Sequence, residues 1–294
     1  MIFKSESEGS IGDLSGGLSG CRLTLSSDGK IVSKYSSGTE YNSRLLKQEE
    51  KQKYFSTLEI GNIKCPAVLS TDCKSDPCFF EMEYISGSSY LNFLEYASPS
   101  YINKFIDSIF FYFDFISDIK SKTYSNQEFI SICREKLRSI KNKIPKSEFI
   151  EYLDKRISEC THSNIEFTFC HGDLTLSNIL FSPDSFCFLD FLDSYIESWT
   201  VDLVKLKQDL FYHWNLKRSS AGLNLRSVQV SMFIWESLVD RYNEIISSES
   251  FKILEVLNFL RIYPYLRTEE EKNILNEIIK KTPIYEEFNS SNGG

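Results

Sequence analysis

The chain has 294 residues, of which 41% are hydrophobic and 14% aromatic, enough apolar material for one large domain or two lobes. The net charge of -8 argues against a nucleic-acid surface, which normally needs a basic stripe. The apolar run at residues 109–116 is interrupted by Asp114 and is too short to span a bilayer, and the first residues carry no signal-peptide core. We therefore expect a globular cytoplasmic protein with no nucleic-acid or membrane partner, and the oligomeric state stays open.

Eight cysteines are scattered along the chain, several of them within apolar segments and with no secretory signal. This distribution predicts free buried thiols rather than a disulfide framework. Cys73 and Cys78 flank a Lys-Ser-Asp-Pro turn, without a CxxC pattern or a nearby histidine. An ordinary hairpin is therefore favoured there over a zinc site.

The first predicted elements form a hairpin. Residues 14–25 read as a glycine-rich turn between strand signals, and residues 30–35 alternate like a strand that ends near Lys34. Asp28 and Gly29 supply the turn between the two strands.

Within the glycine-rich turn, backbone amides of small residues would be able to approach a phosphate closely, although a plain hairpin is the alternative. The candidate phosphate contacts are Gly17, Ser19 and Gly20. No GxxxxGK[ST] motif is present, so a Walker A loop is not expected.

Residues 41–58 are charged and carry apolar side chains at helical spacing, which predicts a helix. A strand is predicted next at residues 78–85, where the sequence alternates. Ser86 and Gly87 interrupt this strand, and this break is the predicted hinge between two lobes.

The rest of the chain is predicted to be mainly helical. Ser98 and Pro99 form a good N-cap and first-turn pair for a helix with apolar residues at helical spacing. Further helices are predicted at residues 128–143, 148–159, 202–216, 225–246, 251–262 and 269–280. The predicted caps of the last three are Asn224, Ser250 and Thr268.

Residues 167–191 interrupt the helical pattern with three short apolar strands, so residues 171–178 are predicted to form a loop. Asp173 and Asn178 have the spacing of the kinase loop H-R-D-x-x-x-x-N, in which the Asp accepts the hydroxyl proton and the Asn holds magnesium. Asp190 ends a buried strand, where a carboxylate needs a partner such as a magnesium ion on ATP phosphates.

A simpler interpretation exists for each of these residues. His171 and Asp173 would form a hydrogen-bonded turn, Asn178 would bond its own loop, and Asp190 would cap a turn. The occurrence of all of them in kinase order favours a phosphoryl-transfer site. His171 is the exception, and we expect it to orient the loop rather than to take part in the chemistry.

The pattern HGDLTLSN followed by FLDF resembles the aminoglycoside phosphotransferase and choline kinase superfamily, whose signature is H-G-D-x-x-x-x-N and then an Asp at a strand end. The resemblance implies an α+β, two-lobed protein-kinase-like fold. An antiparallel-sheet N-terminal lobe would occupy residues 1–85 and a mainly helical lobe residues 88–294, with a hinge at about 83–87. Gly172 and Leu192 differ from the H-R-D and D-F-G motifs of protein kinases.

The resemblance also implies a short Pro-containing strand at residues 65–69 and assigns roles in the N-terminal lobe. Lys34 would contact the α- and β-phosphates, and the following helix would supply it with a carboxylate. Glu49 and Glu50 both qualify; Glu49 is preferred because it shares a helix face with Leu45 and Leu46.

Main-chain groups of Glu83 and Ile85 would hold the adenine edge, and Met82 would line the pocket, unless Met82 is simply a core residue. Asp202, at the start of a helix after the metal Asp, is expected to be structural. Asp193 is expected to be an exposed loop carboxylate, with an acceptor contact or a second metal as the alternatives.

The predicted function is ATP-dependent transfer of a phosphoryl group to a hydroxyl of a small metabolite, a sugar or an amino alcohol, with Mg²⁺ as cofactor. Choline-type recognition would need an aromatic cage. The candidate rings are Tyr195, Trp199, Tyr212 and Trp214. The alternatives are an aminoglycoside or choline-type kinase, a protein kinase, and a catalytically silent kinase-like binding or scaffold protein.

Overall fold

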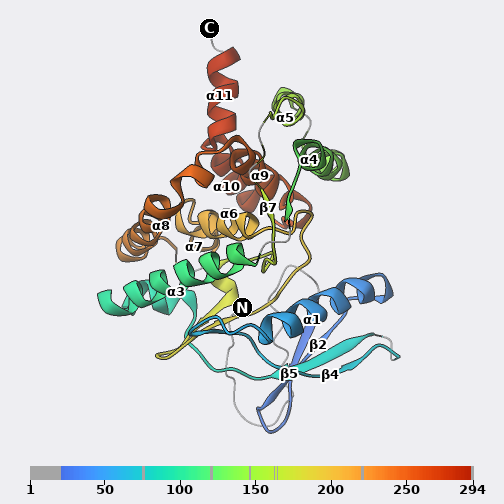
Figure 1. Ribbon diagram of the computed structural model, residues 1–294, viewed down its shortest axis with the longest axis vertical. Coiled ribbons are helices and arrows are strands. Elements are labelled where there is room, and N and C mark those ends of the chain that lie inside the picture. The colour runs from blue at the N-terminus through green and yellow to red at the C-terminus, as the bar shows by residue number, and fades with distance from the viewer. Residues whose placement is uncertain are drawn as a thin grey trace. The chain divides into compact units, whose positions relative to one another are not determined.

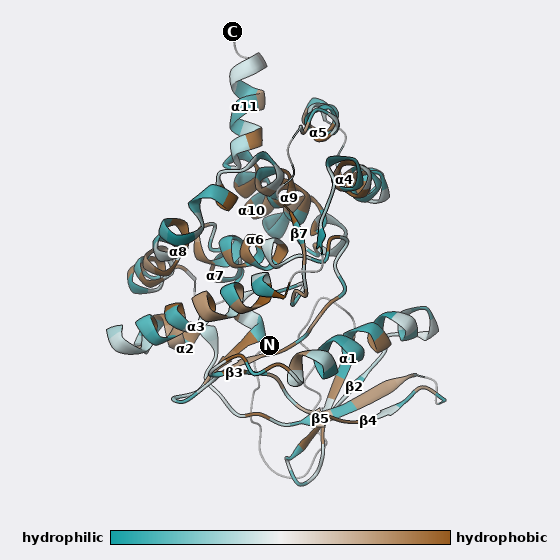
Figure 2. Ribbon diagram, in the orientation of Figure 1, coloured by the Kyte–Doolittle hydropathy of each residue, from teal (hydrophilic) through white to brown (hydrophobic). Residues whose placement is uncertain are grey.

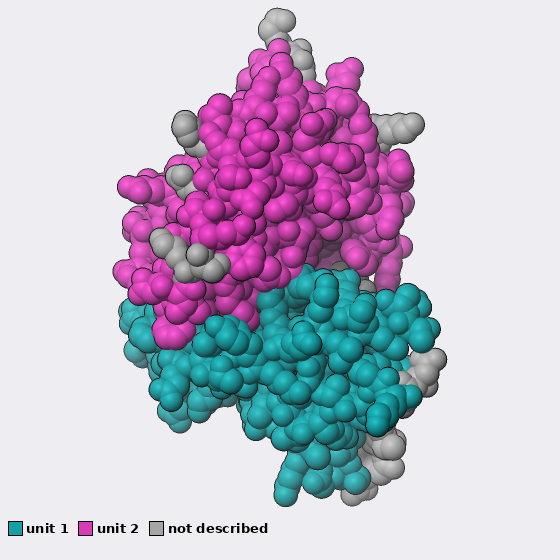
Figure 3. Space-filling model, turned by 45° about the vertical axis from the view of Figure 1, so that its right-hand side comes forward, with its two compact units in different colours: residues 1–112, 171–193 teal, residues 113–170, 194–294 magenta. Residues whose placement is uncertain are grey.

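The computed structural model describes residues 21–74, 77–119, 122–145, 147–161, 163, 165–219 and 222–292. Gly17, Ser19 and Gly20, the candidate phosphate contacts, lie outside the described residues. The chain divides into two compact units (Figure 3), residues 1–112 with 171–193 as unit 1 and residues 113–170 with 194–294 as unit 2. The division falls within the helix α3, Pro99–Asp118. The lobe boundary at residues 83–87 stays a prediction.

Unit 1 contains two sheets and the helices that pack on them. Its elements are β1 (Arg22–Leu25), β2 (Ile31–Tyr35), η1 (Thr39–Tyr41), α1 (Asn42–Ser56), β3 (Ile63–Lys64), β4 (Val68–Asp72), β5 (Phe79–Glu83), α2 (Tyr90–Tyr96), the first part of α3, η2 (Leu176–Asn178), β8 (Ile179–Phe181) and β9 (Phe186–Phe188). The larger sheet is antiparallel throughout, in the order β1-β2-β5-β4.

The hairpin β1-β2 turns at Gly29, whose φ of 70 suits glycine, as the Asp-Gly pair predicts. Along β2 exposure alternates, so that Val32 and Lys34 lie on the buried face. The strand period of two therefore aims the Lys34 ammonium into the interior of unit 1, where only 4% of the residue is exposed.

Helix α1 lies along one face of this sheet (Figure 1). It buries Leu45 and Phe55, and Phe55 packs against Phe188 and Phe191 with ring centroids 5.9 and 4.9 Å apart. The helix therefore joins the larger sheet to the segment that carries the predicted catalytic residues.

The smaller sheet has the order β3-β9-β8, with β3 parallel to β9 and β8 antiparallel to β9. Phe181 stacks on Phe93 of α2 at 4.1 Å, and Phe186 meets Phe105 of α3 edge to face at 5.1 Å. These buried rings, each able to contribute several kcal/mol by area, fix the two strands that flank the catalytic loop.

Unit 2 is mainly helical. Its elements are the end of α3, β6 (Lys122–Thr123), α4 (Asn126–Lys141), α5 (Glu148–Ser158), β7 (Glu166–Phe167), α6 (Trp199–Leu210), α7 (Trp214–Arg218), α8 (Leu225–Ile246), α9 (Glu249–Leu260), η3 (Tyr263–Tyr265), α10 (Glu269–Lys280) and α11 (Pro283–Asn292). Figure 2 shows hydrophilic residues over much of α4 and α5, which bury narrow apolar stripes such as Phe129 and Leu137, and Phe149 and Leu153.

Several helix ends agree with the sequence because capping side chains fix them. Asn224 accepts from the Ser227 N–H at 2.8 Å, and Thr268 forms a capping box with Glu271. For α9 the cap is Ser248 rather than Ser250, so this helix begins two residues earlier than predicted.

Three further features of the structure differ from the sequence-based predictions. The predicted helix at residues 202–216 is two helices, α6 and α7, because His213 has a left-handed φ of 58. The predicted strand at residues 65–69 lies at Val68–Asp72. Cys73 and Cys78 form a disulfide, whereas the other six cysteines are free and buried as predicted.

Candidate active site

The predicted catalytic loop and the segment after β9 are held together by their backbones. The Leu192 N–H donates to the His171 oxygen at 2.9 Å, and the Leu189 N–H donates to the Asn178 oxygen at 2.9 Å. Gly172, between them, has a φ of 84, and a Cβ on it would lie 2.1 Å from the Leu192 oxygen. Only glycine fits at this position, which explains the Gly of the HGD motif.

His171 is fully buried between the same two segments. Its Nδ1 accepts from the Asp173 N–H at 3.2 Å, so the proton is on Nε2, which donates to the Leu189 oxygen at 2.8 Å. Burial lowers the pKa of His171 to about 4. A neutral imidazole bonded to backbone on both sides orients the loop, the role expected for this residue.

Asp173 and Asn178 are brought together by the turn between them. The Asn178 Nδ2 donates to the main-chain oxygen of Asp173 at 2.9 Å and to its carboxylate at 3.1 Å. Among the described residues, no donor bonds the Asn178 Oδ1. The amide nitrogen therefore fixes Asp173, and the amide oxygen remains available to a cation.

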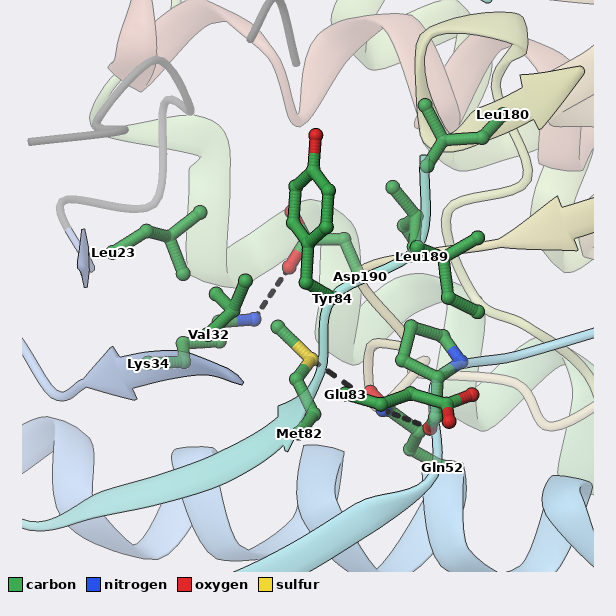
Figure 4. Close-up of a pocket in the computed structure, with 12 residues that line it drawn as sticks. Leu23, Val32, Lys34, Gln52, Met82, Glu83, Tyr84, Leu180, Leu189 and Asp190 are labelled. Atoms are coloured by element: carbon green, nitrogen blue, oxygen red, sulfur yellow. Dashed lines mark hydrogen bonds and ion pairs between the residues drawn. The ribbon is translucent and has the colours of Figure 1, made fainter. Parts of the chain in front are cut away.

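Asp190 has a φ of 67, in the left-handed region that Asp tolerates better than most residues. Its carboxylate forms an ion pair with the Lys34 ammonium, although 156 residues separate them in the sequence (Figure 4). The Lys34 ammonium also donates to the Gln48 Oε1 at 2.7 Å. A non-glycine residue with a left-handed backbone, whose carboxylate faces a buried lysine, is a feature of functional sites.

The pairing of Lys34 with Glu49, inferred from the family resemblance, is corrected by the structure. Glu49 accepts from the Thr71 hydroxyl at 2.6 Å and pairs with Lys53, while Gln48 occupies the position beside Lys34. One step along an α-helix turns the side chain by about 100°, which directs Glu49 toward β4 instead of β2. Glu50 is exposed.

A pocket within unit 1 opens beside the Lys34 and Asp190 pair. It is lined by Leu23, Val32, Lys34, Gln52, Pro66, Met82, Glu83, Tyr84, Ile85, Leu180, Leu189 and Asp190. Apolar side chains from both sheets form opposite walls, and the charged pair lies at one end (Figure 4). A pocket with apolar walls beside a charged pair suits an aromatic base that carries an anionic tail.

At the end of β5, beside the pocket, the backbone N–H groups of Glu83, Tyr84 and Ile85 differ in their hydrogen bonds. The Glu83 N–H donates to the Ala67 oxygen at 3.0 Å, and the Tyr84 N–H donates to the Lys30 oxygen at 2.7 Å. Within the described residues the Ile85 N–H has no acceptor. Of the predicted base contacts, Glu83 therefore has only its carbonyl to offer, while Ile85 has a donor available.

Four residues of α1 that the sequence reading did not select contact the site. Gln48 contacts Lys34, Lys51 donates to the Leu192 oxygen at 2.7 Å, and Arg44 pairs with Asp193 at 3.3 Å. Gln52 donates to the Pro66 oxygen at 2.7 Å and approaches the Met82 sulfur at 3.5 Å. The spacing of Leu45, Gln48, Gln52 and Phe55 is helical, and that spacing could have identified both glutamines as buried.

Residues 121–226, which include the catalytic loop, match the model of the family described as Phosphotransferase enzyme family, APH. A comparison with curated protein sequences finds no match. The match and the solved structures described next confirm the predicted family resemblance.

Three solved structures illustrate the similarity of fold. The GDP complex of wild-type aminoglycoside 2'-phosphotransferase-IIIa aligns over 93% of both chains, with a TM-score of 0.61 and 14% identity. A ternary complex of a thermostable aminoglycoside phosphotransferase APH(4)-Ia mutant with ADP and hygromycin B has a TM-score of 0.61 and 10% identity, over 93% of this chain and 94% of that one. A choline/ethanolamine kinase family protein from Mesorhizobium loti has a TM-score of 0.56 and 12% identity, over 95% and 90%.

The fold is therefore the predicted α+β kinase-like one, with an antiparallel sheet in unit 1 and a mainly helical unit 2. The family match over residues 121–226 supports a phosphotransferase. In the part of the chain that the structure covers, none of the helices has the length and apolar character of a membrane span. The same residues contain no cluster of three or more His, Cys, Asp or Glu side chains suited to a metal.

Proposed function

We propose that the protein is an ATP-dependent kinase that transfers the γ-phosphoryl group to a hydroxyl of a small metabolite. The observation that carries the proposal is the ion pair of Lys34 with a left-handed Asp190 at the end of an apolar pocket. Phosphoryl transfer depends mainly on positioning and charge stabilisation, and these two residues supply a cation for phosphate oxygens and an anion for their metal ion.

The base would enter between the apolar walls formed by Leu23 and Val32 on one side and Leu189 on the other. The Glu83 carbonyl would accept from the base edge, the Ile85 N–H would donate to it, and Met82 would line the pocket. Two structurally similar proteins were solved as GDP and ADP complexes, which supports the binding of a nucleotide. Backbone recognition of this kind distinguishes adenine by its alternating donor and acceptor pattern.

Magnesium would arrive with the nucleotide. Asp190 and the Asn178 Oδ1 fit it, because a carboxylate and an amide oxygen are ligands that Mg²⁺ accepts together with phosphate oxygens. The amide nitrogen of Asn178 is already committed to Asp173, so only its oxygen is available.

Asp173 would orient the acceptor hydroxyl and take its proton. Its carboxylate is held by the Asn178 amide at 3.1 Å, and its backbone is held by His171 at 3.2 Å. One restraint on the carboxylate and one on the backbone of the same residue reduce the entropy lost on reaching the transition state.

The acceptor we propose is a sugar or an amino alcohol, ahead of choline-like compounds and aminoglycosides. A choline cage needs open aromatic faces, but three of the four candidate rings face a cation of the chain itself. Lys136 lies 5.5 Å from the Tyr195 ring, Lys207 5.6 Å from Tyr212, and Arg218 4.9 Å from Trp214. The fourth, Trp199, packs on Phe113 and Tyr242.

An aminoglycoside acceptor stays the second candidate, since similar folds include proteins solved with kanamycin and with hygromycin B. Against it, Asp193 is paired with Arg44, which reduces the negative charge that a polycation would need.

The test is a panel of sugars, amino alcohols, choline and aminoglycosides, each incubated with ATP and Mg²⁺ and followed by phosphorus NMR. We expect kcat/KM to be highest for a sugar or an amino alcohol, with the phosphate on a hydroxyl. Phosphorylation of only an aminoglycoside or only choline would contradict the proposed order of acceptors, but it would agree with the proposed kinase activity. No phosphoryl transfer to any acceptor, with ATP bound, would favour the alternative of a catalytically silent binding protein.

A further inference from the structure

The buried Lys34 ammonium is hydrogen-bonded to a neutral amide, that of Gln48. The residue is 4% exposed and Gln48 is 1% exposed, so both side chains are shielded from water. The Lys34 ammonium donates to the Gln48 Oε1 at 2.7 Å, and the Gln48 Nε2 donates to the Tyr41 hydroxyl oxygen at 3.0 Å. The hydroxyl of Tyr41 therefore fixes the orientation of the amide, with its oxygen toward the lysine.

The neighbouring carboxylates do not share this lysine. Glu49 is bonded to Thr71 and Lys53. Among the residues that the structure describes, Asp190 is the one carboxylate bonded to the Lys34 ammonium. The positive charge of Lys34 is thus balanced by the same side chain that the proposed function assigns to magnesium.

We propose that Gln48 is a positioning residue that aims Lys34 through a neutral amide, so that Asp190 alone neutralises the lysine before substrate binds. This inference rests on the proposed function. With a magnesium nucleotide bound, Asp190 would hold the metal ion and Lys34 the phosphates, and the ammonium would bring its full charge because Gln48 contributes none. The exchange leaves the bond between Gln48 and Lys34 intact.

A carboxylate at position 48 would act differently. It would form a charge-assisted hydrogen bond with Lys34, worth about 1.5 to 3 kcal/mol, in a site where little water screens it. That bond would strengthen the substrate-free protein and would compete with the nucleotide phosphates for the ammonium. The neutral amide avoids this competition while it preserves the direction of the lysine.

The experiment compares Gln48→Glu with the wild type and with Lys47→Gln. Lys47 precedes Gln48 on the exposed face of α1, and its substitution changes the net charge by the same amount. For each protein, calorimetric titration gives the affinity for ATP with Mg²⁺, and thermal unfolding without nucleotide gives Tm.

We expect Q48E to retain or raise the Tm of the substrate-free protein and to weaken magnesium-dependent ATP binding about 10- to 100-fold, the equivalent of the added charge-assisted bond. We expect K47Q to match the wild type in both measurements. A merely structural residue would lower Tm and affinity together, so the opposite signs are the signature of the proposed role.

Tighter ATP binding by Q48E than by the wild type would overturn the inference, because position 48 would then simply favour a carboxylate. If Q48E does not fold, Gln48→Met removes the acceptor without adding charge. Weaker ATP binding by Q48M supports the role, and affinity equal to that of the wild type overturns it. A wild-type protein that binds no ATP with Mg²⁺ would overturn the proposed function, and with it this inference.

Discussion

The carbonyl oxygen of Leu192 lies where the side chain of Gly172 would begin, 2.1 Å from an ideal Cβ. This contact joins the predicted catalytic loop to the segment after Asp190, and the Leu192 N–H bond to the His171 oxygen closes the same junction. Lys51 adds a bond from α1 to the Leu192 oxygen. The distance between the two predicted reactive loops thus depends on the absence of a single Cβ.

Gly172→Ala is the first prediction. The methyl group cannot be accommodated without separating the loops, and the left-handed φ adds strain of about 1–2 kcal/mol. We expect a larger loss of stability than from Gly29→Ala, where φ is also positive but nothing lies within 4 Å of the added Cβ. Urea unfolding of both variants measures the difference. Equal losses would contradict the importance of the Leu192 contact.

The second prediction concerns pH. Burial lowers the pKa of His171 to about 4 from its ordinary value of 6.5, so the unfolded chain binds more protons between these values. The neutral, buried imidazole therefore makes its full contribution to the free energy of unfolding above pH 6.5, and this contribution is lost as pH falls toward 4. Between pH 7 and pH 5 we expect the wild type to lose about 2 kcal/mol more than His171→Gln does. Urea unfolding at both pH values measures it, and parallel losses would show that the imidazole is not held neutral.

The third prediction concerns a buried ion pair in unit 2. Lys207 lies 2.6 Å from Glu255 among the rings of Phe211, Tyr212, Trp235 and Phe251. Burial raises the pKa of Glu255, and Lys207 opposes that shift. Lys207→Met leaves this carboxylate without its partner and should cost about 3–5 kcal/mol.

The control for this pair is Lys280→Met, which breaks the exposed pair of Lys280 and Glu277 and should cost less than about 1 kcal/mol. In the double variant of Lys207→Met with Glu255→Gln, the loss should be smaller than the sum of the single losses. Additive losses in chemical unfolding would mean that the two side chains are not coupled.

The fourth prediction separates the two aspartates. Asp173→Asn should leave the affinity for ATP nearly unchanged and reduce turnover about 100- to 10,000-fold, because the lost group acts on the acceptor. Single-turnover rates and nucleotide titrations check this. If Asp173→Asn instead lost ATP binding but kept its turnover per bound complex, the roles assigned to Asp173 and Asp190 would have to be exchanged.

Much of the fold was predictable because it rests on local signals. The helices α8 and α10 have the predicted bounds, since caps such as Asn224 and Thr268 fix their first residues. The order of Asp173, Asn178 and Asp190 likewise follows from motif spacing. Asp173 lies on a loop before β8 and Asp190 follows β9, as predicted, whereas Asn178 ends the short 3-10 helix η2.

Other features depend on the orientation of side chains in three dimensions. Glu49 is buried on α1 as expected from Leu45, yet it faces β4, and only the packing of the helix on the sheet decides between Glu49 and Gln48. His213 interrupts a continuous helical pattern with a left-handed φ that no sequence rule requires. The pairing of Cys73 with Cys78 follows from a Cα separation of 4.3 Å across a hairpin.

The central claim is that Lys34 and Asp190 bind a magnesium nucleotide, and calorimetric titration of ATP with and without Mg²⁺ tests it most directly. The account predicts saturable binding by the wild type that requires Mg²⁺, a rise in Tm only when metal and nucleotide are both present, and loss of both effects in Asp190→Asn. ATP binding that is independent of Mg²⁺, or equal in the wild type and Asp190→Asn, would contradict it.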